Sequence, residues 1–486
     1  MIYKLRPYQE ECVKSISDYI NSDRHDPVLI VGPVGCGKSL LIAEAARLMG
    51  DKTLILQPSK ELLQQNHDKI TSYGIPATIY SASCGKKELS NMIYATLGSI
   101  KKVVDKLKEM GIRNVLIDEA HAGYSPEDGS EFMTFMNELK PKKVIGFTAT
   151  PCRLKTMSIG QVSYSQLNFI TRMRPVYFKN LIHVIQVEEM IRQGFWTPLK
   201  YETWDFNGDA LKLNSNGSEY TAESISEAVR KNGLNNLILR RLMVLKDVCR
   251  SILVFMDSVE SCNTAAEWMN AKICAGMAEV VHGGTPKKQR EAIVEGFKSG
   301  KTKVVFNYSA LGTGFDHPGL DCVIVGRPTF SFSSFYQWLG RAVRIKDGKD
   351  SALVVDCCNN SSRFGDIRKL SIENYKGYGW GMFIGDKLIT NIPMGDKVTK
   401  TDLDIKAAKK DRRRGLAQGV TAAPVPGRPD HPLGSTVMTF GKYCGWMFHS
   451  IPVSYFKFIN ETFDWDNDRN KDIKEYIDFL IKNNRL

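Results

Sequence analysis

The stretch VLIVGPVGCGKSLLIAEAARLM, residues 28–49, combines a short apolar run, a glycine-rich loop and a segment with helical apolar spacing. The run at 28–31 is typical of a buried parallel strand, and the spacing after Ser39 is typical of a helix. The loop between them fits the pattern G-x-x-x-x-G-K-[ST], whose glycines let backbone N–H groups surround phosphates at the positive end of a helix dipole. This order predicts an α/β fold with a phosphate-binding loop. A glycine-rich turn without a nucleotide is the alternative that the loop alone leaves open.

Every residue of this loop is a candidate for binding ATP. Lys38 is expected to reach the β- and γ-phosphates, and the hydroxyl group of Ser39 is expected to ligate Mg²⁺. The backbone of the loop is expected to surround the same phosphates. The candidate nucleotide-binding residues of the loop are Gly32, Pro33, Val34, Gly35, Cys36, Gly37, Lys38 and Ser39.

Two adjacent acids, Asp118 and Glu119, follow the apolar run at 114–117 and open the tetrapeptide DEAH. Acids at the carboxyl end of a parallel strand lie at the ligand crevice of an open α/β sheet. Asp118 is expected to hold Mg²⁺, mostly through water, and Glu119 is expected to polarise the attacking water. Such a pair alone also fits an ordinary helix N-terminus. The phosphate-binding loop upstream favours the catalytic interpretation.

Short apolar runs alternate with helix-compatible segments in two long regions of the chain. This rhythm is typical of buried parallel strands joined by crossover helices, and it predicts two tandem α/β units with doubly wound parallel sheets. The segment at 205–219 is predicted to be a surface loop, and 373–400 is predicted to contain a hairpin turning near Gly385 and Asp386. The predicted organisation is a first lobe at 1–200, a connector at 201–235, a second lobe at 236–400, a linker at 401–435 and a small C-terminal module at 436–486.

Composition limits the class of protein and its partners. The chain has 486 residues, 43% of them hydrophobic, and a net charge of +13, which suits a globular protein with a polyanionic partner. It contains no apolar stretch of about 20 residues and no signal-peptide core, so we expect a cytoplasmic protein without a membrane partner. Its eleven cysteines form no CxxC pair, which favours buried reduced thiols over a zinc site.

The loop and the DEAH tetrapeptide resemble those of superfamily 2 helicases of the DEAH/DExH type. The resemblance covers roughly residues 1–360 and implies two tandem RecA-like lobes that hydrolyse ATP with Mg²⁺. It also implies that Arg6 and Gln9 contact the nucleotide, since Gln9 resembles the adenine-reading glutamine of the family. The further motifs, all in family order, are RPYQ (6–9), LQPSKELLQQ (56–65), TLGSI (96–100), TAT (148–150), ALGTGFDHP (310–318) and QWLGRAVR (337–344).

The sixth of these motifs supplies candidate arginine fingers. The resemblance makes Arg341 and Arg344 catalytic, with Gln337 beside them. A guanidinium group suits this role because it stays charged and meets phosphate oxygens with two parallel hydrogen bonds. The fingers lie on a different lobe from Lys38, so hydrolysis requires the lobes to close. An amphipathic helix with solvated arginines is the alternative for this segment by itself.

Other family positions are expected to contact nucleotide or nucleic acid. Gly314 and Asp316 resemble the fifth-motif residues that touch the nucleotide. The family holds its nucleic acid mainly through phosphates, so binding should be salt-sensitive and largely independent of sequence. The candidate nucleic-acid contacts are Ser59, Lys60, Gly98, Ser99 and Thr313.

Among subfamilies, the chain is similar to phage and bacterial repair helicases, including the RadD-like group. The phrases KELLQQNHDK, GFTATPCR and RQGFWTPL carry this likeness. The cysteine-rich zinc tail of that group is absent, so no role that depends on it transfers. DEAH stands where DECH is common, a change that leaves the Mg²⁺ chemistry alone.

Features outside the motor leave several alternatives open. In the C-terminal module, Lys442, Tyr443 and Trp446 either contact DNA or fill a small core. The basic run at 406–414 is either a DNA clamp or a solvated linker, and Tyr378 and Trp380 either pack a hairpin or separate strands. The preferred function is a DNA helicase or translocase acting on single-stranded or branched DNA. The alternatives are an RNA helicase and an ATP-gated clamp that does not unwind, and protein partners are unknown.

Overall fold

The computed structural model describes residues 4–50, 52–159, 162–311, 315–407, 431–436, 438, 443, 447–462 and 471–486. The chain divides into two compact units, Met1–Tyr375 with Gly379–Val398, and Lys376–Tyr378 with Thr399–Leu486. The cysteines in the described residues are free thiols, and most are buried. In the same residues, no helix combines the length and apolar character needed to cross a bilayer.

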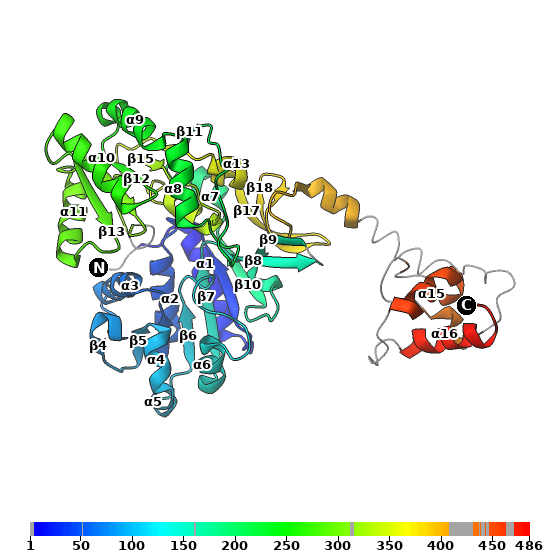
Figure 1. Ribbon diagram of the computed structural model, residues 1–486. Helices are drawn as coiled ribbons and strands as arrows, with labels where there is room; N and C mark the ends of the chain where they lie inside the picture. Colours follow the sequence, from blue (N-terminus) through cyan, green and yellow to red (C-terminus); the bar gives the residue numbers. More distant parts are fainter. Residues whose placement is uncertain are drawn as a thin grey trace. The chain divides into compact units, whose positions relative to one another are not determined.

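The first lobe (residues 4–192) contains a sheet with the strand order β10-β1-β7-β6-β2-β5-β3-β4 (Figure 1). Neighbouring strands are parallel, except that β4 runs antiparallel to β3. The central strands are apolar and fully buried, as expected where helices cover both faces. The strands are β1 (Val28–Val31), β2 (Thr53–Leu56), β3 (Thr78–Ser81), β4 (Lys86–Lys87), β5 (Met92–Ala95), β6 (Asn114–Ile117), β7 (Lys143–Thr148) and β10 (Asn180–Val184).

Crossover helices connect these strands. α1 precedes the sheet, and its Pro7 takes the first helical position, where a missing N–H costs nothing. The helices of this lobe are α1 (Pro7–Asn21), α2 (Lys38–Met49), α3 (Lys60–Ser72), α4 (Leu97–Ile100), α5 (Val104–Glu109), α6 (Glu131–Leu139) and α7 (Val187–Arg192).

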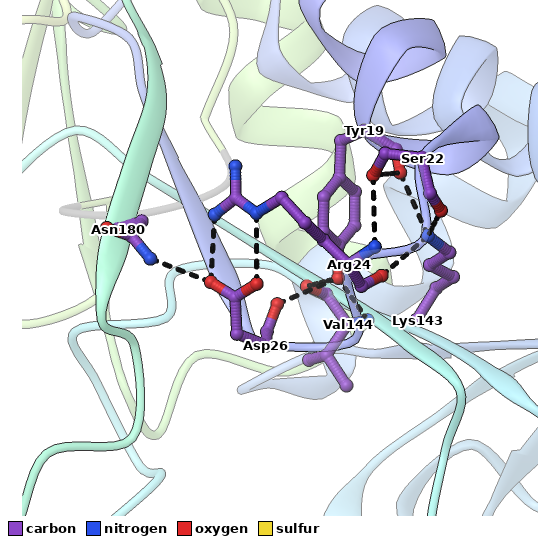
Figure 2. A network of polar contacts seen from close by, with 7 residues as sticks. All are labelled: Tyr19, Ser22, Arg24, Asp26, Lys143, Val144 and Asn180. Atoms are coloured by element: carbon purple, nitrogen blue, oxygen red, sulfur yellow. Dashed lines mark hydrogen bonds and ion pairs between the residues drawn. The ribbon is translucent and has the colours of Figure 1, made fainter.

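A buried lysine fixes the end of α1 to the sheet. Lys143, at the start of β7, is 5% exposed, and its Nζ donates to the carbonyl oxygens of Tyr19, Ser22 and Arg24 at 2.9, 2.7 and 2.6 Å (Figure 2). The last carbonyl groups of a helix lack partners within the helix, and this ammonium supplies them with donors. Nearby, Arg24 pairs with Asp26 at 2.8 Å, and Asn180 of β10 donates to the same carboxylate. The lysine therefore joins helix and strand at one end of the lobe.

The second lobe (residues 199–398) contains a parallel sheet with the strand order β11-β16-β15-β12-β14-β13. Successive residues of its strands enter two different cores: Leu253 and Phe255 join the core shared with the first lobe, while Ile252 and Val254 join a second core. This alternation follows from the two-residue period of a strand. The strands are β11 (Leu199–Thr203), β12 (Ile252–Phe255), β13 (Ala278–His282), β14 (Val304–Tyr308), β15 (Cys322–Val325) and β16 (Ala352–Asp356).

The lobe boundary differs from the prediction. β11 pairs with β16 from Leu199 to Thr203, so the second lobe begins before residue 201 and includes much of the predicted connector. β11 is an edge strand whose sequence, LKYET, is only partly buried, and it therefore lacks the continuous apolar run of a central strand. The helices of this lobe are α8 (Ala222–Lys231), α9 (Leu234–Val248), α10 (Val259–Lys272), α11 (Lys287–Ser299), α12 (Phe332–Leu339) and α13 (Asn360–Phe364).

Two antiparallel elements accompany the sheets. β8 (Cys152–Ile159) pairs with β9 (Val162–Phe169), and β17 (Leu370–Tyr375), β18 (Gly379–Ile384) and β19 (Lys387–Leu388) form a meander. The predicted turn at Gly385 and Asp386 is confirmed by the pairing of Ile384 with Lys387. Trp380 packs against the shared core from β18. The boundary between the two units falls within β20 (Val398–Thr399).

The second unit contains a separate small core. Buried side chains of α15 (Val453–Thr462) and α16 (Lys471–Lys482) form it together with Met438 and Phe448, and Tyr443 packs partly buried against it. Residues 400–407 are helical, so the segment predicted as a linker begins with a helix. The rest of the basic run, from 408, lies outside the described residues, as do Lys442 and Trp446.

Candidate active site

The loop from Gly32 to Ser39 joins β1 to α2. Gly37 has a φ of 83°, a left-handed conformation that favours glycine, and a Cβ added there would lie 2.6 Å from Nε2 of Gln9. α2 therefore follows a residue without a side chain, and the N–H groups of its first two residues, Lys38 and Ser39, would face an anion at the helix N-terminus. The conformation fits a triphosphate held by backbone groups and by Lys38.

Gln9 connects α1 to this loop. It is 4% exposed; its Oε1 accepts from the backbone N–H of Arg6 at 3.0 Å, and its Nε2 donates to the carbonyl oxygen of Cys36 at 2.9 Å. The guanidinium group of Arg6 lies 4.7 Å from the ring centroid of Phe195. Arg6, Gln9 and Phe195 all line one cleft beside the loop, so the two polar residues predicted to contact the nucleotide lie in the same cleft as Lys38.

The two acids of DEAH lie directly after β6. Asp118 is 5% exposed, and its Oδ1 accepts from the backbone N–H of Glu119 at 2.9 Å. Glu119 has a φ of 44°, a strained conformation for a residue with a side chain, of the kind that proteins retain at functional sites. Its Oε2 lies 3.4 Å from Nδ1 of His121. The Glu119 side chain lines the cleft at the carboxyl end of β6.

The electrostatics of the two acids differ. Burial raises the pKa of Asp118, and repulsion from Glu119 raises it further. Burial also acts to raise the pKa of Glu119. The charge of Lys38, the hydrogen bond and charge of His121 and the charge of Arg341 outweigh burial, so the pKa of Glu119 is lowered. The neighbouring cations therefore favour the ionised form of Glu119, whereas burial and the charge of Glu119 oppose ionisation of Asp118.

Residues from both lobes line the cleft, which has a volume of about 520 Å³. Burial lowers the pKa of Arg341 to about 10, and repulsion from Arg344 contributes, while Glu119 and Asp316 oppose the shift. Nη1 of Arg341 donates to the carbonyl oxygen of Phe315 at 2.6 Å, and Arg344 pairs with Asp316. The predicted site residues that line the cleft are Arg6, Gln9, Val34, Gly35, Gly37, Lys38, Ser39, Asp118, Glu119, Asp316, Gln337, Arg341 and Arg344.

The remaining predicted nucleotide contacts either do not line the cleft or lie outside the described residues. Gly32, Pro33 and Cys36 belong to the loop but not to the cleft lining of the described residues, and the Cys36 side chain is fully buried. Gly314 lies outside the described residues, as does Thr313.

Ser39 and Asp118 fit a Mg²⁺ ion by their chemistry. Both offer oxygen ligands, and both line the cleft beside Lys38. The described residues contain no group of three or more His, Cys, Asp or Glu side chains arranged to hold a metal. Mg²⁺ takes few protein ligands and completes its shell with water and substrate phosphates, so Ser39 and Asp118 would be enough to hold it.

Contacts between the lobes surround the cleft. Nε1 of Trp196 donates to the carbonyl oxygen of Val34 at 2.8 Å, and the next residue, Thr197, donates its backbone N–H to the carbonyl oxygen of Val343 at 2.8 Å. A Cβ added at Gly340 would lie 2.5 Å from Cγ2 of Val34, so glycine permits this close approach. The phosphate-binding loop and the sixth motif therefore pack directly on each other.

The candidate nucleic-acid contacts follow neighbouring strands. Ser59 caps α3 after β2, accepting from the N–H of Leu62 at 3.3 Å, and Lys60 is the first residue of that helix. Gly98 and Ser99 belong to α4 after β5, which pairs with β2 in parallel. Parallel neighbours end at the same edge of a sheet, so these four residues share one edge of the first lobe.

The site also contains residues that had not been predicted, and three of them make contacts that organise it. Asn66, Phe195 and Trp196 come from α3 and from the segment between the lobes, outside the positions that the motifs mark. Phe195 and Trp196 lie in RQGFWTPL, a phrase noted only for its subfamily likeness. The adjacent aromatic residues in this phrase, which fell within the predicted first lobe, were the available signal.

Comparisons with known proteins agree with this geometry. Residues 2–153 match the family of the type III restriction enzyme res subunit, and residues 235–346 match the helicase conserved C-terminal domain, together more than half of the chain. The chain belongs to the superfamily 2 helicases. Its two matched regions correspond to the lobes that meet at the cleft.

Individual relatives of this helicase are distant. It is 25% identical over 332 residues to a 51.5 kDa protein of a Lactococcus phage, covering 68% of this chain and 65% of that protein. It is 24% identical over 279 residues to the putative ATP-dependent helicase IRC3 of Saccharomyces cerevisiae, covering 57% of this chain and 38% of that protein. The match thus spans less than two thirds of each relative's length.

A solved structure shares the fold. The ATP-dependent type ISP restriction-modification enzyme LlaBIII, bound to DNA, superimposes with a TM-score of 0.54 at 14% identity, covering 86% of this chain and 30% of that one.

Proposed function

We propose that this helicase is an ATP-driven motor that moves on DNA and remodels replication, recombination or repair intermediates. One observation carries the proposal: Lys38 and Glu119 of the first lobe line the same cleft as Arg341 and Arg344 of the second. A γ-phosphate in that cleft would have cations on both sides. The charge that develops on its oxygens during transfer would then be stabilised only when the lobes are closed.

Each side chain has a distinct task in this proposal. Ser39 and Asp118 hold Mg²⁺, which neutralises phosphate charge when bound. Lys38 binds the phosphates, and Glu119, kept ionised by its neighbours, orients the attacking water and accepts its proton. Arg341 and Arg344 complete the site from the second lobe. ATP therefore favours the closed arrangement, and the loss of ATP releases it.

The choice of DNA rests on supporting observations. The net charge of +13 suits a polyanion, and the solved relative LlaBIII is described with DNA. Ser59, Lys60, Gly98, Ser99 and Thr313 are the proposed contacts to the phosphate backbone. We place the protein in the cytoplasm of a bacterial or phage-infected cell, in keeping with its phage relative.

The test is the rate of ATP hydrolysis without polymer and with single-stranded DNA, branched DNA and RNA of equal length. We expect single-stranded or branched DNA to give the largest stimulation. A larger stimulation by RNA would assign the motor to RNA. An absence of turnover with every polymer, together with ATP-dependent binding, would show an ATP-gated clamp instead.

A further inference from the structure

Asn66 connects the two residues assigned to Mg²⁺. It lies on α3 and is 3% exposed. Its Oδ1 accepts from Oγ of Ser39 at 2.6 Å, and its Nδ2 donates to Oδ2 of Asp118 at 2.9 Å and to Oε1 of Gln57 at 3.1 Å. One buried amide thus bonds both proposed metal ligands at once.

The chemistry of the amide fixes the direction of these bonds. Asp118 is ionised when it ligates a cation and then only accepts hydrogen bonds, so the Asn66 amino group faces Asp118 and its carbonyl oxygen faces the hydroxyl of Ser39. The hydroxyl then donates to Asn66, and its oxygen lone pairs remain for a cation. Asp118 receives one donor on each oxygen, from Asn66 and from the N–H of Glu119. Outer partners of this kind orient metal ligands and tune metal affinity.

The helix that carries Asn66 also begins at the proposed nucleic-acid contacts. Ser59 caps α3 and Lys60 is its first residue. Asn66 is six residues further along, about 9 Å at the rise of an α-helix. Leu62, Gln65, Asn66 and Lys69 of the same helix line the nucleotide cleft. A displacement of the N-terminus of α3 by a bound strand would therefore move Asn66 relative to Ser39 and Asp118.

We propose that Asn66 is a positioning residue that holds the Mg²⁺ ligands Ser39 and Asp118, and that α3 thereby couples strand binding to Mg²⁺ affinity. This inference rests on the proposed function. It adds a physical route by which a polynucleotide stimulates hydrolysis: the bound strand shifts α3, and α3 adjusts the positions of the metal ligands Ser39 and Asp118 through Asn66.

The test measures metal-dependent nucleotide binding rather than turnover. A fluorescent, non-hydrolysable ATP analogue is titrated onto the full chain at increasing Mg²⁺, and also in EDTA, with and without single-stranded DNA. We expect Asn66→Ala and the similarly sized Asn66→Leu to raise the half-saturating Mg²⁺ concentration about 10-fold or more, with binding in EDTA unchanged. DNA should lower the half-saturating Mg²⁺ concentration for the wild type and have a smaller effect on both variants.

Gln64→Ala is the matched control, because Gln64 lies on the same helix and donates to the exposed Asp68. An unchanged Mg²⁺ dependence in both Asn66 variants would overturn the proposal, and so would an equal loss of binding in EDTA with a lowered melting temperature, which would mark Asn66 as structural. DNA binding to the wild type, followed by fluorescence anisotropy, separates the two hypotheses. Its absence would contradict the proposed function, whereas normal DNA binding with unchanged Mg²⁺ dependence would contradict this inference alone.

Discussion

Nε2 of His121, in the first lobe, lies 3.1 Å from Oγ of Ser333, in the second. The other nitrogen of the same ring, Nδ1, is 2.8 Å from Oγ1 of Thr148 and 3.4 Å from the carboxylate of Glu119. Ser333 also contacts Thr150, at 3.2 Å between the two hydroxyl oxygens. Glu119, the proposed catalytic base of the first lobe, is therefore connected through a histidine to α12 of the second, the helix that leads to Arg341.

This contact predicts that Ser333→Ala lowers the kcat of ATP hydrolysis about 10-fold while the KM for ATP changes little, because Ser333 does not line the cleft but orients His121. Steady-state kinetics with saturating polymer measure the effect. Ser334→Ala is the control, since Ser334 bonds within α12 to Ser331. If His121→Ala and Ser333→Ala prove additive in the double variant, the two residues do not act together.

Lys38→Ala is expected to reduce turnover by at least about 100-fold, because the β- and γ-phosphates lose their cation. Polymer binding should stay largely intact, since Lys38 is not among the proposed polymer contacts, which belong to α3 and α4. ATPase assays and anisotropy with labelled single-stranded DNA measure the two properties. Normal turnover would remove the loop from the mechanism.

Arg341→Lys should lower kcat by about 100-fold or more, although it preserves the charge, because an ammonium group lacks the two-pronged geometry of guanidinium. Nucleotide binding, measured separately with a non-hydrolysable analogue, should weaken much less. A thermal unfolding curve controls for the loss of the hydrogen bond to Phe315. Unchanged kcat would show that the group does not reach the reacting phosphate.

Lys143→Met is expected to destabilise the first lobe by about 2–4 kcal/mol, since three carbonyl oxygens each lose a hydrogen bond from the buried ammonium group. Chemical denaturation measures the free energy of unfolding. Lys142→Met, at the exposed neighbouring position, should change it by less than about 0.5 kcal/mol. Equal effects of the two substitutions would contradict a structural role for the ammonium group shown in Figure 2.

His317 predicts a pH dependence of stability. Burial lowers its pKa to about 4 from the ordinary 6.5, and Lys346, Lys298 and Lys349 contribute to the shift. Between these two pH values the unfolded chain binds a proton that the folded chain does not. The contribution of His317 to stability therefore falls as the pH drops from 6.5 towards 4, by about 3 kcal/mol at most. His317→Asn should flatten this part of the stability curve, measured by denaturation at several pH values, whereas His25→Asn at an exposed position should not.

Much of the fold could be predicted from local patterns. The buried strands before the phosphate-binding loop and before DEAH have continuous apolar sequences, and their order along the chain predicts a parallel sheet. β11 was not predicted as a strand of the second lobe, because an edge strand has a mixed polar and apolar sequence. Asn66 and Trp196 were not predicted as site residues, because their roles arise from tertiary contacts that residue spacing does not reveal. Asn66 contacts Asp118, and Trp196 contacts Val34.

The lack of a side chain at Gly340 determines how closely the sixth motif can pack against the phosphate-binding loop. The sixth motif approaches the phosphate-binding loop so closely that a single added methyl group would overlap the side chain of Val34. Glycine at position 340 therefore allows the two lobes to approach closely at this contact. In Gly340→Ala, the added methyl group would hold the two lobes apart at this contact. Every charged group of the site would remain, but the guanidinium groups of Arg341 and Arg344 would lie too far from the γ-phosphate.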